Sequence, residues 1–192
     1  MSAPGAQVPS ARQTSIEPLS ASAFAAFGSA LGSPCPTDPA ALAFSHPGSD
    51  FWHAHDFNPG EGGQTEVLWV NYRDHSLRLR TLEVHWLTEQ AIIPLGGHDI
   101  VHVVCPTRDD GSRLPDTQRL RAFHVASGQG LCMRPGCWHT SFVFGGQTTC
   151  LMLTRRSTTR DLVAHLRGES AAGETSIVPV VRPGEAAWLL RA

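Results

Sequence analysis

A succession of short strand-like segments fills the chain from residue 65 to residue 154, and this feature most limits how the chain can fold. Each segment alternates in polarity or is rich in β-branched residues, and Gly, Pro and Asp separate it from the next. No helical segment of useful length interrupts them, so the pattern predicts a β-sandwich or a small barrel. The expected strands are TEVLWVNY, LRLRTLEVHW, AIIPL, DIVHVVC, LRAFHVA, GLCMR, TSFVFG and TTCLMLT.

The whole chain has 192 residues, which is enough for one domain with a substantial core. Residues 1–14 are small, polar and contain proline, and they predict a disordered tail. We therefore expect a single β-barrel domain over residues 15–167. Residues 168–192 would form a C-terminal extension that adds an edge strand or reaches a partner subunit.

Two short helices are expected at the edges of this barrel. Ser20 can cap a helix over residues 21–27, and Gly28 can end it with a left-handed residue. Residues 159–166 predict the other helix, whereas the proline-rich stretch over residues 32–63 is expected to be loop.

Charge and hydropathy exclude several classes of function. The formal net charge is −2 with 17% charged residues, so no basic surface indicates a nucleic acid or an anionic membrane as partner. No apolar run approaches the ~20 residues of a membrane span, and the opening residues do not resemble a secretory signal, so we expect a cytoplasmic protein. The 5 cysteines contain no C-x-x-C pair, which predicts reduced thiols.

The segment LRLRTLEVHW brings two ionisable residues to one face of a strand. Alternation puts Glu83 and His85 on the same face as Leu77, Leu79 and Thr81. If that face points into a barrel, a carboxylate and an imidazole share its upper end, which is costly unless they are paired or used. The opposite face carries an apolar strip that needs a cover, either another sheet or a second subunit: Leu82, Val84 and Trp86.

Gln90 and His139 can join Glu83 and His85 at the same mouth. Gln90 directly precedes the strand AIIPL, and Pro135-Gly136 is a type II turn pair that would carry His139 into a later strand. Histidine, glutamate and glutamine together suit a borderline divalent metal.

The remaining candidates have structural readings beside the functional ones. His102, His124 and His165 show no partner pattern and are expected to be hydrogen-bonded structural residues. The loop cluster of His53, His55 and Asp56 is equally compatible with a solvated surface and with a site. Trp138 is expected to pack beneath His139. Arg121 suits either a strand surface or a clamp on a carboxylate.

The spacing E-x-H-x4-Q followed by P-G-x-x-H resembles the two-part metal motif of the cupin fold. The run LEVHWLTEQAIIPL, then LRAF, QG and G-x-W-H, together with EPLSASAFAAFG, resembles the ureidoglycolate lyase family over about residues 16–156. The resemblance implies a cupin double-stranded β-helix or jelly-roll barrel and a cytoplasmic homodimer. It implies an enzyme of allantoin and purine breakdown that splits ureidoglycolate into glyoxylate and urea, with nickel or zinc sometimes bound and no nucleotide cofactor.

Carried over residue by residue, the resemblance assigns Glu83, His85, Gln90 and His139 to catalysis and to the metal. Trp138, Arg121 and Arg155 would bind the small carboxylate substrate. The chain departs from the family pattern, which commonly has arginine, histidine, proline and aspartate at four positions occupied here by Val84, Thr140, Ser141 and Thr154. Two other functions therefore stay open: a metal-dependent cupin enzyme acting on another small hydroxy or oxo acid, and a non-catalytic metabolite-binding cupin.

Overall fold

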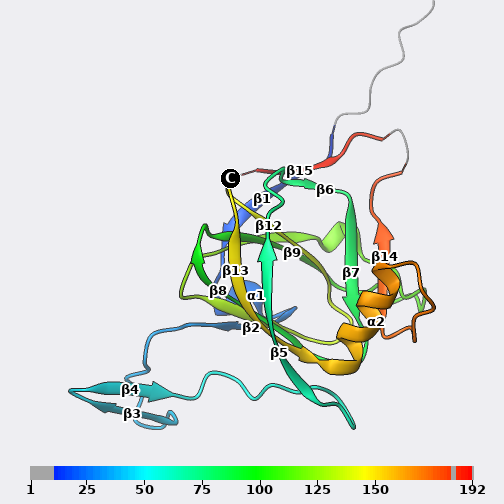
Figure 1. Cartoon of the computed structure of the whole chain (residues 1–192). Coiled ribbons are helices and arrows are strands. Elements are labelled where there is room, and N and C mark those ends of the chain that lie inside the picture. Colours follow the sequence, from blue (N-terminus) through cyan, green and yellow to red (C-terminus); the bar gives the residue numbers. More distant parts are fainter. Residues whose placement is uncertain (1–10, 183–184, 192) are drawn as a thin grey trace, which may run out of the picture.

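Two curled, mainly antiparallel sheets form the barrel of this computed structural model, which describes residues 11–182 and 185–191 (Figure 1). One sheet contains the strand order β11-β8-β13-β5 and the other contains β10-β9-β12-β7. Except for β9 and β10, neighbouring strands in these orders are not consecutive in sequence, which is the interleaving of a jelly roll. The mainly β, cupin-like jelly-roll barrel predicted from the sequence is therefore confirmed. Its strands are β5 (Thr65–Tyr72), β7 (Thr81–His85), β8 (Gln90–Gly97), β9 (Ile100–Cys105), β10 (Arg121–Val125), β11 (Gly130–Met133), β12 (Trp138–Val143) and β13 (Thr148–Arg155).

Shorter elements extend or flank the two sheets. Strand β2 joins the first sheet beside β11, and β14, β1, β15 and β6 join the second. The helix expected near residue 160 is present and begins earlier than predicted, at Arg156. The bounds of these elements are β1 (Gln13–Pro18), α1 (Ala21–Phe24), β2 (Gly28–Leu31), β6 (Arg78–Leu79), the 3-10 helix η1 (Thr117–Arg119), α2 (Arg156–Leu166), β14 (Thr175–Pro179) and β15 (Trp188–Arg191).

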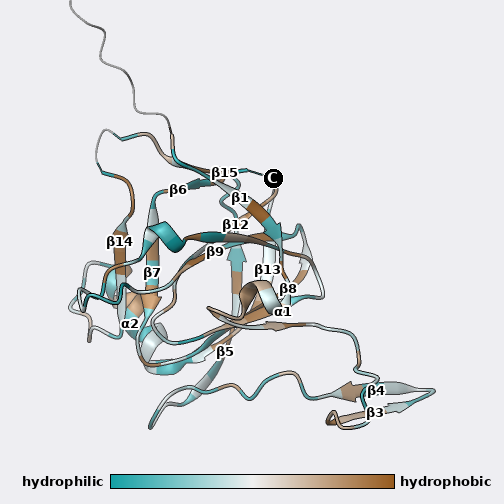
Figure 2. Ribbon diagram, turned by 180° about the vertical axis from the view of Figure 1, so that it is seen from behind, coloured by the Kyte–Doolittle hydropathy of each residue, from teal (hydrophilic) through white to brown (hydrophobic). Residues whose placement is uncertain are grey.

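The second sheet buries apolar residues on both faces. Its inner face packs against the first sheet around Phe123 and Ile92, and its outer face forms a separate cluster that contains Leu82 and Val84. Figure 2 shows hydrophobic stretches along β9 and β14 of this sheet. The apolar strip for which the sequence demanded a cover is thus buried.

The C-terminal segment of the same chain supplies much of that cover. Trp188 and Leu190 of β15 and Val178 of β14 belong to the outer cluster or pack against it. The Trp188 indole donates a hydrogen bond to Thr14 Oγ1 at 2.8 Å. Residues 13 and 14, expected in the tail, therefore lie in β1, and the rest of the expected tail up to residue 10 lies outside the described residues.

Glycine 28 does not end the first helix as the sequence predicted. Ser20 caps α1 as expected, since its side chain accepts a hydrogen bond from Ala23 N at 3.2 Å, but the helix ends at Phe24. Gly28 opens β2, where a Cβ atom would lie 1.9 Å from the Cys132 carbonyl oxygen. Its lack of a side chain serves a close approach of two strands.

A hairpin that the sequence analysis missed projects from the barrel. Strands β3 (Ala43–His46) and β4 (Ser49–Trp52) pair only with each other and stand apart from the two sheets (Figure 1). Phe44 and Phe51 stack with ring centroids 5.0 Å apart, yet they remain 50% and 63% exposed. We call residues 43–52 the arm. No helix in the described part of the chain is long and apolar enough to cross a membrane.

Candidate active site in the barrel

Glu83, His85 and His139 meet inside the barrel. His139 on β12 pairs with Glu83 on β7, and its Nε2 lies 3.2 Å from Oε1 of the carboxylate. The rings of His85 and His139 have centroids 5.2 Å apart. One nitrogen or oxygen from each of the three side chains lies within 4.8 Å of the others. The strand alternation that put Glu83 and His85 on one inward face is therefore confirmed.

The hydrogen bonds of His139 fix where its lone pair lies. Its Nδ1 is 3.0 Å from the Cys137 carbonyl oxygen, which only accepts, so Nδ1 carries the proton. In the neutral ring, Nε2 is then an acceptor facing the Glu83 carboxylate, which also only accepts. Nε2 has no hydrogen-bond partner although it lies close to Oε1. The buried imidazole and the part-buried carboxylate, both acceptors, favour a proton or a metal cation between them.

His85 also leaves one nitrogen free inside the barrel. Its Nδ1 is 3.1 Å from the Thr175 hydroxyl, and its buried Nε2 has no partner. Burial and the neighbouring charge of His139 lower the pKa of His85 to about 4, although the Glu83 carboxylate acts in the opposite direction. His85 is therefore neutral at physiological pH, the form that binds a metal.

Glu83 keeps its charge in this setting. Burial by itself would raise the pKa of Glu83, but the contact with His139 and the charges of His139 and His85 outweigh it, and the pKa lies below its usual value. A carboxylate and two imidazoles therefore form a site for a cation or for a shared proton.

The low pKa of His85 predicts a loss of stability in acid. Unfolded His85 takes up a proton below pH 6.5, whereas folded His85 does so only near pH 4, so between these values the unfolded state binds more protons. For the metal-free protein we expect the free energy of unfolding to fall through this window, by up to about 1.4 kcal/mol per pH unit from this group. Urea unfolding of the wild type and of His85→Ala tests this. An identical slope against pH in both proteins would contradict it.

The turn before β12 places His139 as the sequence predicted. Gly136 has a φ of +79°, and Cys137 N donates to the Arg134 carbonyl at 3.3 Å, which together fit a type II turn. Gly136 N also donates to the His85 carbonyl at 2.8 Å, so the turn is tied directly to the end of β7.

His102 forms the inner wall of the site. Its Nε2 lies 3.1 Å from Met133 Sδ, which only accepts, so Nε2 carries the proton and Nδ1 accepts from the Ser141 hydroxyl at 2.9 Å. Its ring stacks on His139 with centroids 5.8 Å apart. His102 is thus a hydrogen-bonded core histidine, as expected, and burial lowers its pKa well below the usual value.

Three residues assigned to the substrate by resemblance do not present a free group to the barrel interior. Trp138 is fully buried in the outer cluster, edge-on to Trp86, because it points away from His139 along the same strand. The Arg121 guanidinium binds the Glu17 carboxylate and the Ala23 carbonyl. Neither Trp138 nor Arg121 therefore offers a free group to the barrel interior in this structure, and their assignment to the substrate stays a prediction.

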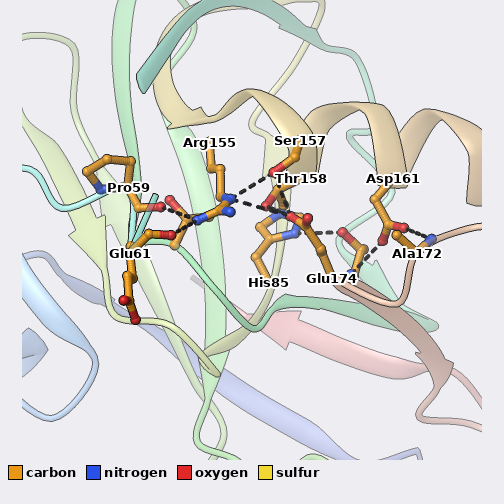
Figure 3. A network of polar contacts seen from close by, with 12 residues as sticks. Pro59, Glu61, His85, Arg155, Ser157, Thr158, Asp161, Ala172 and Glu174 are labelled. Atoms are coloured by element: carbon orange, nitrogen blue, oxygen red, sulfur yellow. Dashed lines mark hydrogen bonds and ion pairs between the residues drawn. The ribbon is translucent and has the colours of Figure 1, made fainter. Parts of the chain in front are cut away.

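Arg155 is equally engaged elsewhere. Its guanidinium donates to the Glu61 carbonyl at 2.9 Å and the Ser157 hydroxyl at 2.7 Å, and it lies 3.7 Å from the Glu174 carboxylate (Figure 3). It holds the loop before β5 to the start of α2. Its role as a clamp on the substrate carboxylate stays a prediction, and it would require the guanidinium to give up some of these contacts.

The strand expected over residues 77–86 is interrupted. It divides into β6 and β7 at Arg80, and Leu77 has a φ of +51°. Leu79 consequently packs in the outer cluster together with Leu82, rather than on the inward face with Glu83. The predicted alternation holds from Leu82 to His85 and fails before it.

A support for His85 comes from the C-terminal extension and was missed in the sequence. Thr175, which contacts His85, donates its backbone N–H to Asp161 Oδ2 at 2.7 Å, and Asp161 also accepts from Ala172 and Gly173 (Figure 3). Glu174 accepts from the hydroxyls of Ser157 and Thr158. These contacts join α2 to β14 and fix the position of the Thr175 hydroxyl.

A second group of potential ligands lies near the loop histidines. His55 Nε2 is 2.9 Å and Asn58 N is 2.8 Å from Glu89 Oε2, and the Cys132 thiol points to the same oxygen. Burial, with help from the Glu89 charge, raises the pKa of Cys132 to about 12, so the thiol stays protonated. These contacts satisfy His55 and Glu89, and they anchor the loop to the barrel; His53 instead contacts Asp56 at the surface.

Comparisons with known proteins give a family match over most of the chain. The family model described as "Ureidoglycolate lyase" matches residues 11–172. A relative named ureidoglycolate lyase from Pseudomonas fluorescens (strain Pf-5) is 34% identical over 130 residues, which cover 65% of this chain and 72% of the relative. One of the same name from Pseudomonas putida (strain F1) is 32% identical over 133 residues, covering 67% and 75%.

Solved structures show a more distant similarity. A dTDP sugar isomerase from Desulfovibrio desulfuricans G20 has 13% sequence identity and a TM-score of 0.40, over 74% of this chain and 82% of that one. A dTDP-4-dehydrorhamnose 3,5-epimerase from Elizabethkingia anophelis NUHP1 has 12% identity and a TM-score of 0.38, over 59% of this chain and 64% of that one.

Proposed function

The chain belongs to the ureidoglycolate lyase family, and we propose that its barrel cavity cleaves ureidoglycolate into glyoxylate and urea. The observation that carries the proposal is the group of Glu83 with the buried His85 and His139, in which both imidazoles keep an unpartnered nitrogen. The family match indicates the reaction, and the free nitrogens supply groups that can accept a proton or bind a metal.

The reaction needs one proton removed and one delivered. Ureidoglycolate has a carbon that bears a carboxylate, a hydroxyl and a ureido nitrogen; loss of the hydroxyl proton forms the aldehyde C=O as the C–N bond breaks, and the departing urea nitrogen takes up a proton. His139 Nε2 has the lone pair for the first step, and Glu83 at 3.2 Å would stabilise the resulting imidazolium. The same imidazolium can return the proton to the urea nitrogen.

The residues present also fit a divalent metal. His85 and His139 offer free nitrogens and Glu83 offers an ionised oxygen, and one ligand atom of each lies within 4.8 Å of the others. This set of nitrogen and oxygen donors suits zinc or nickel. Because Arg121 and Arg155 are engaged elsewhere, the positive charge beside a substrate carboxylate would come from such an ion. When bound, the ion would polarise the hydroxyl and carboxylate oxygens of the substrate.

The departures from the family pattern bear unequally on this function. Val84 is buried in the outer cluster. Thr140 lies on the same outward face of β12 as Trp138 and Phe142. Thr154 is buried on the same face of β13 as the inward residues Cys150 and Met152. Ser141, the fourth departure, contacts the inward-facing His102. Only Ser141 and Thr154 therefore bear on the choice between the lyase and an enzyme for another acid.

A turnover assay with elemental analysis tests the proposal. Purified protein given racemic ureidoglycolate is expected to release glyoxylate and urea in equal amounts. Bound metal without release would support a metal-dependent enzyme for another hydroxy or oxo acid. Neither release nor metal would support a metabolite-binding protein. Removal of metal by a chelator, followed by the same assay, decides whether the ion is required.

We further propose that the arm joins two copies of the chain into a homodimer. An isolated two-stranded hairpin is marginally stable in water. Phe44 and Phe51 of the arm are nevertheless exposed to solvent, as is Leu42 directly before it. On the outer face of β5, Val67 and Trp69 are exposed as well. If the arm of each copy packed against β5 of the other, the same contact would form twice, as in a two-fold symmetric dimer.

The oligomeric state tests the role of the arm. We expect the wild type to sediment as a dimer and Phe44→Asp with Phe51→Asp as a monomer with a barrel that still unfolds cooperatively. Leu166→Asp, which changes an equally exposed leucine on α2, should remain dimeric. A monomeric wild type, or a dimer that survives the double substitution, would rule out this interface. The cytoplasmic location remains a prediction of the sequence.

A further inference from the structure

Three polar side chains form a row on the inner face of the first sheet. Glu66 on β5 pairs with Thr154 on β13. Leu153 pairs with Ala91 on β8, so the next residues, Thr154 and Gln90, are also neighbours. The strands run side by side (Figure 1), and Glu66 shares its face of β5 with Leu68 and Tyr72, which pack against the inner core. We call Glu66, Thr154 and Gln90 the polar row.

Every member of the polar row has a buried atom without a partner. These atoms are Glu66 Oε2, Thr154 Oγ1 and Gln90 Oε1, and Thr154 and Gln90 are only 2% and 4% exposed. An unsatisfied buried polar group costs about 1–3 kcal/mol. Adjacent unsatisfied groups on one inward face are the arrangement expected of a binding surface in the absence of its ligand.

The chemistry of the polar row selects a ligand rich in N–H groups. The free atoms of Glu66 and Gln90 only accept hydrogen bonds, and Thr154 can either accept or donate. We infer that the polar row binds the ureido group of the substrate, an inference that rests on the proposed function. The ureido N–H groups would donate to Glu66 and Gln90, and the Thr154 hydroxyl would donate to the ureido carbonyl. The glycolate end of the substrate is then directed to Glu83, His85 and His139.

Kinetics of Glu66→Gln test this inference. The substitution keeps the shape of the side chain but replaces one acceptor by a donor, so we expect the KM for ureidoglycolate to rise about 10-fold or more. Inhibition by glyoxylate, which lacks the ureido group, should change less than about 2-fold, because that product uses the other end of the cavity. Glu169→Gln, which changes an exposed carboxylate outside the barrel, is the matched control.

A second pair of variants keeps the test independent of folding. Thr154→Val removes the hydroxyl and should raise the KM by a similar factor, whereas Thr154→Ser retains it and should stay near the wild type. A wild type without turnover would refute the proposed function. An active wild type with an unchanged KM in Glu66→Gln and Thr154→Val, or with glyoxylate inhibition weakened in proportion to the KM, would overturn the inference alone.

Discussion

Replacing His139 by alanine is expected to lower kcat for ureidoglycolate cleavage about 10²- to 10⁴-fold, the usual contribution of a positioned proton-transfer group. The substitution removes the lone pair that faces Glu83 and one of the free nitrogens of the cavity. It also leaves the Cys137 carbonyl without its imidazole donor. Steady-state release of glyoxylate measures the loss, and thermal unfolding shows whether the barrel persists.

His165→Ala is the control for this experiment. His165 is exposed near the end of α2, outside the cavity. It should retain wild-type turnover. A His139→Ala enzyme that turns over as fast as the wild type, with the control also unaffected, would remove His139 from the chemistry.

Replacing Trp138 by alanine is expected to destabilise the protein by about 3–5 kcal/mol, the range measured for large aromatic residues removed from cores. Trp138 is fully buried behind the site and lies edge-on to Trp86 with ring centroids 5.8 Å apart. The denaturant midpoint of unfolding measures this loss. Turnover by the fraction that remains folded should fall less than in His139→Ala, since the indole does not reach the cavity.

Trp138→Phe separates packing from a polar role. The Trp138 Nε1 is buried without a partner, so phenylalanine removes an unsatisfied group and retains most of the contact area. We expect a small change in stability and near wild-type kinetics. A strong rise in KM with unchanged stability would restore Trp138 to the substrate site.

The proximity of Glu83, His85 and His139 could be predicted from the sequence because it depends on local geometry. Strand alternation brings Glu83 and His85 to one face, and a type II turn determines where His139 enters β12. The same reasoning was available for Glu66. TEVLWVNY alternates, and the face that carries Glu66 ends at Tyr72, yet no motif drew attention to it.

Other features could not be predicted because they depend on contacts between distant segments. Arg121 binds Glu17, which is 104 residues away, and His85 contacts Thr175 across 90 residues. The sequence does not show whether the guanidinium of an arginine in a strand is free or already bound to a carboxylate. The arm was not predicted because proline-rich sequence favours loops. The position of Leu79 was predicted wrongly because the strand breaks at Arg80.

A double-mutant cycle on kcat/KM tests most directly whether Glu83 and His139 act as one unit in one cavity. The variants are Glu83→Gln, His139→Ala and the two combined, each assayed for glyoxylate release. If the two side chains cooperate, the double variant should lose little more activity than His139→Ala alone, because residues of one catalytic unit are not additive. Losses that multiply would show that the two residues act independently, and the account of the site would then be wrong.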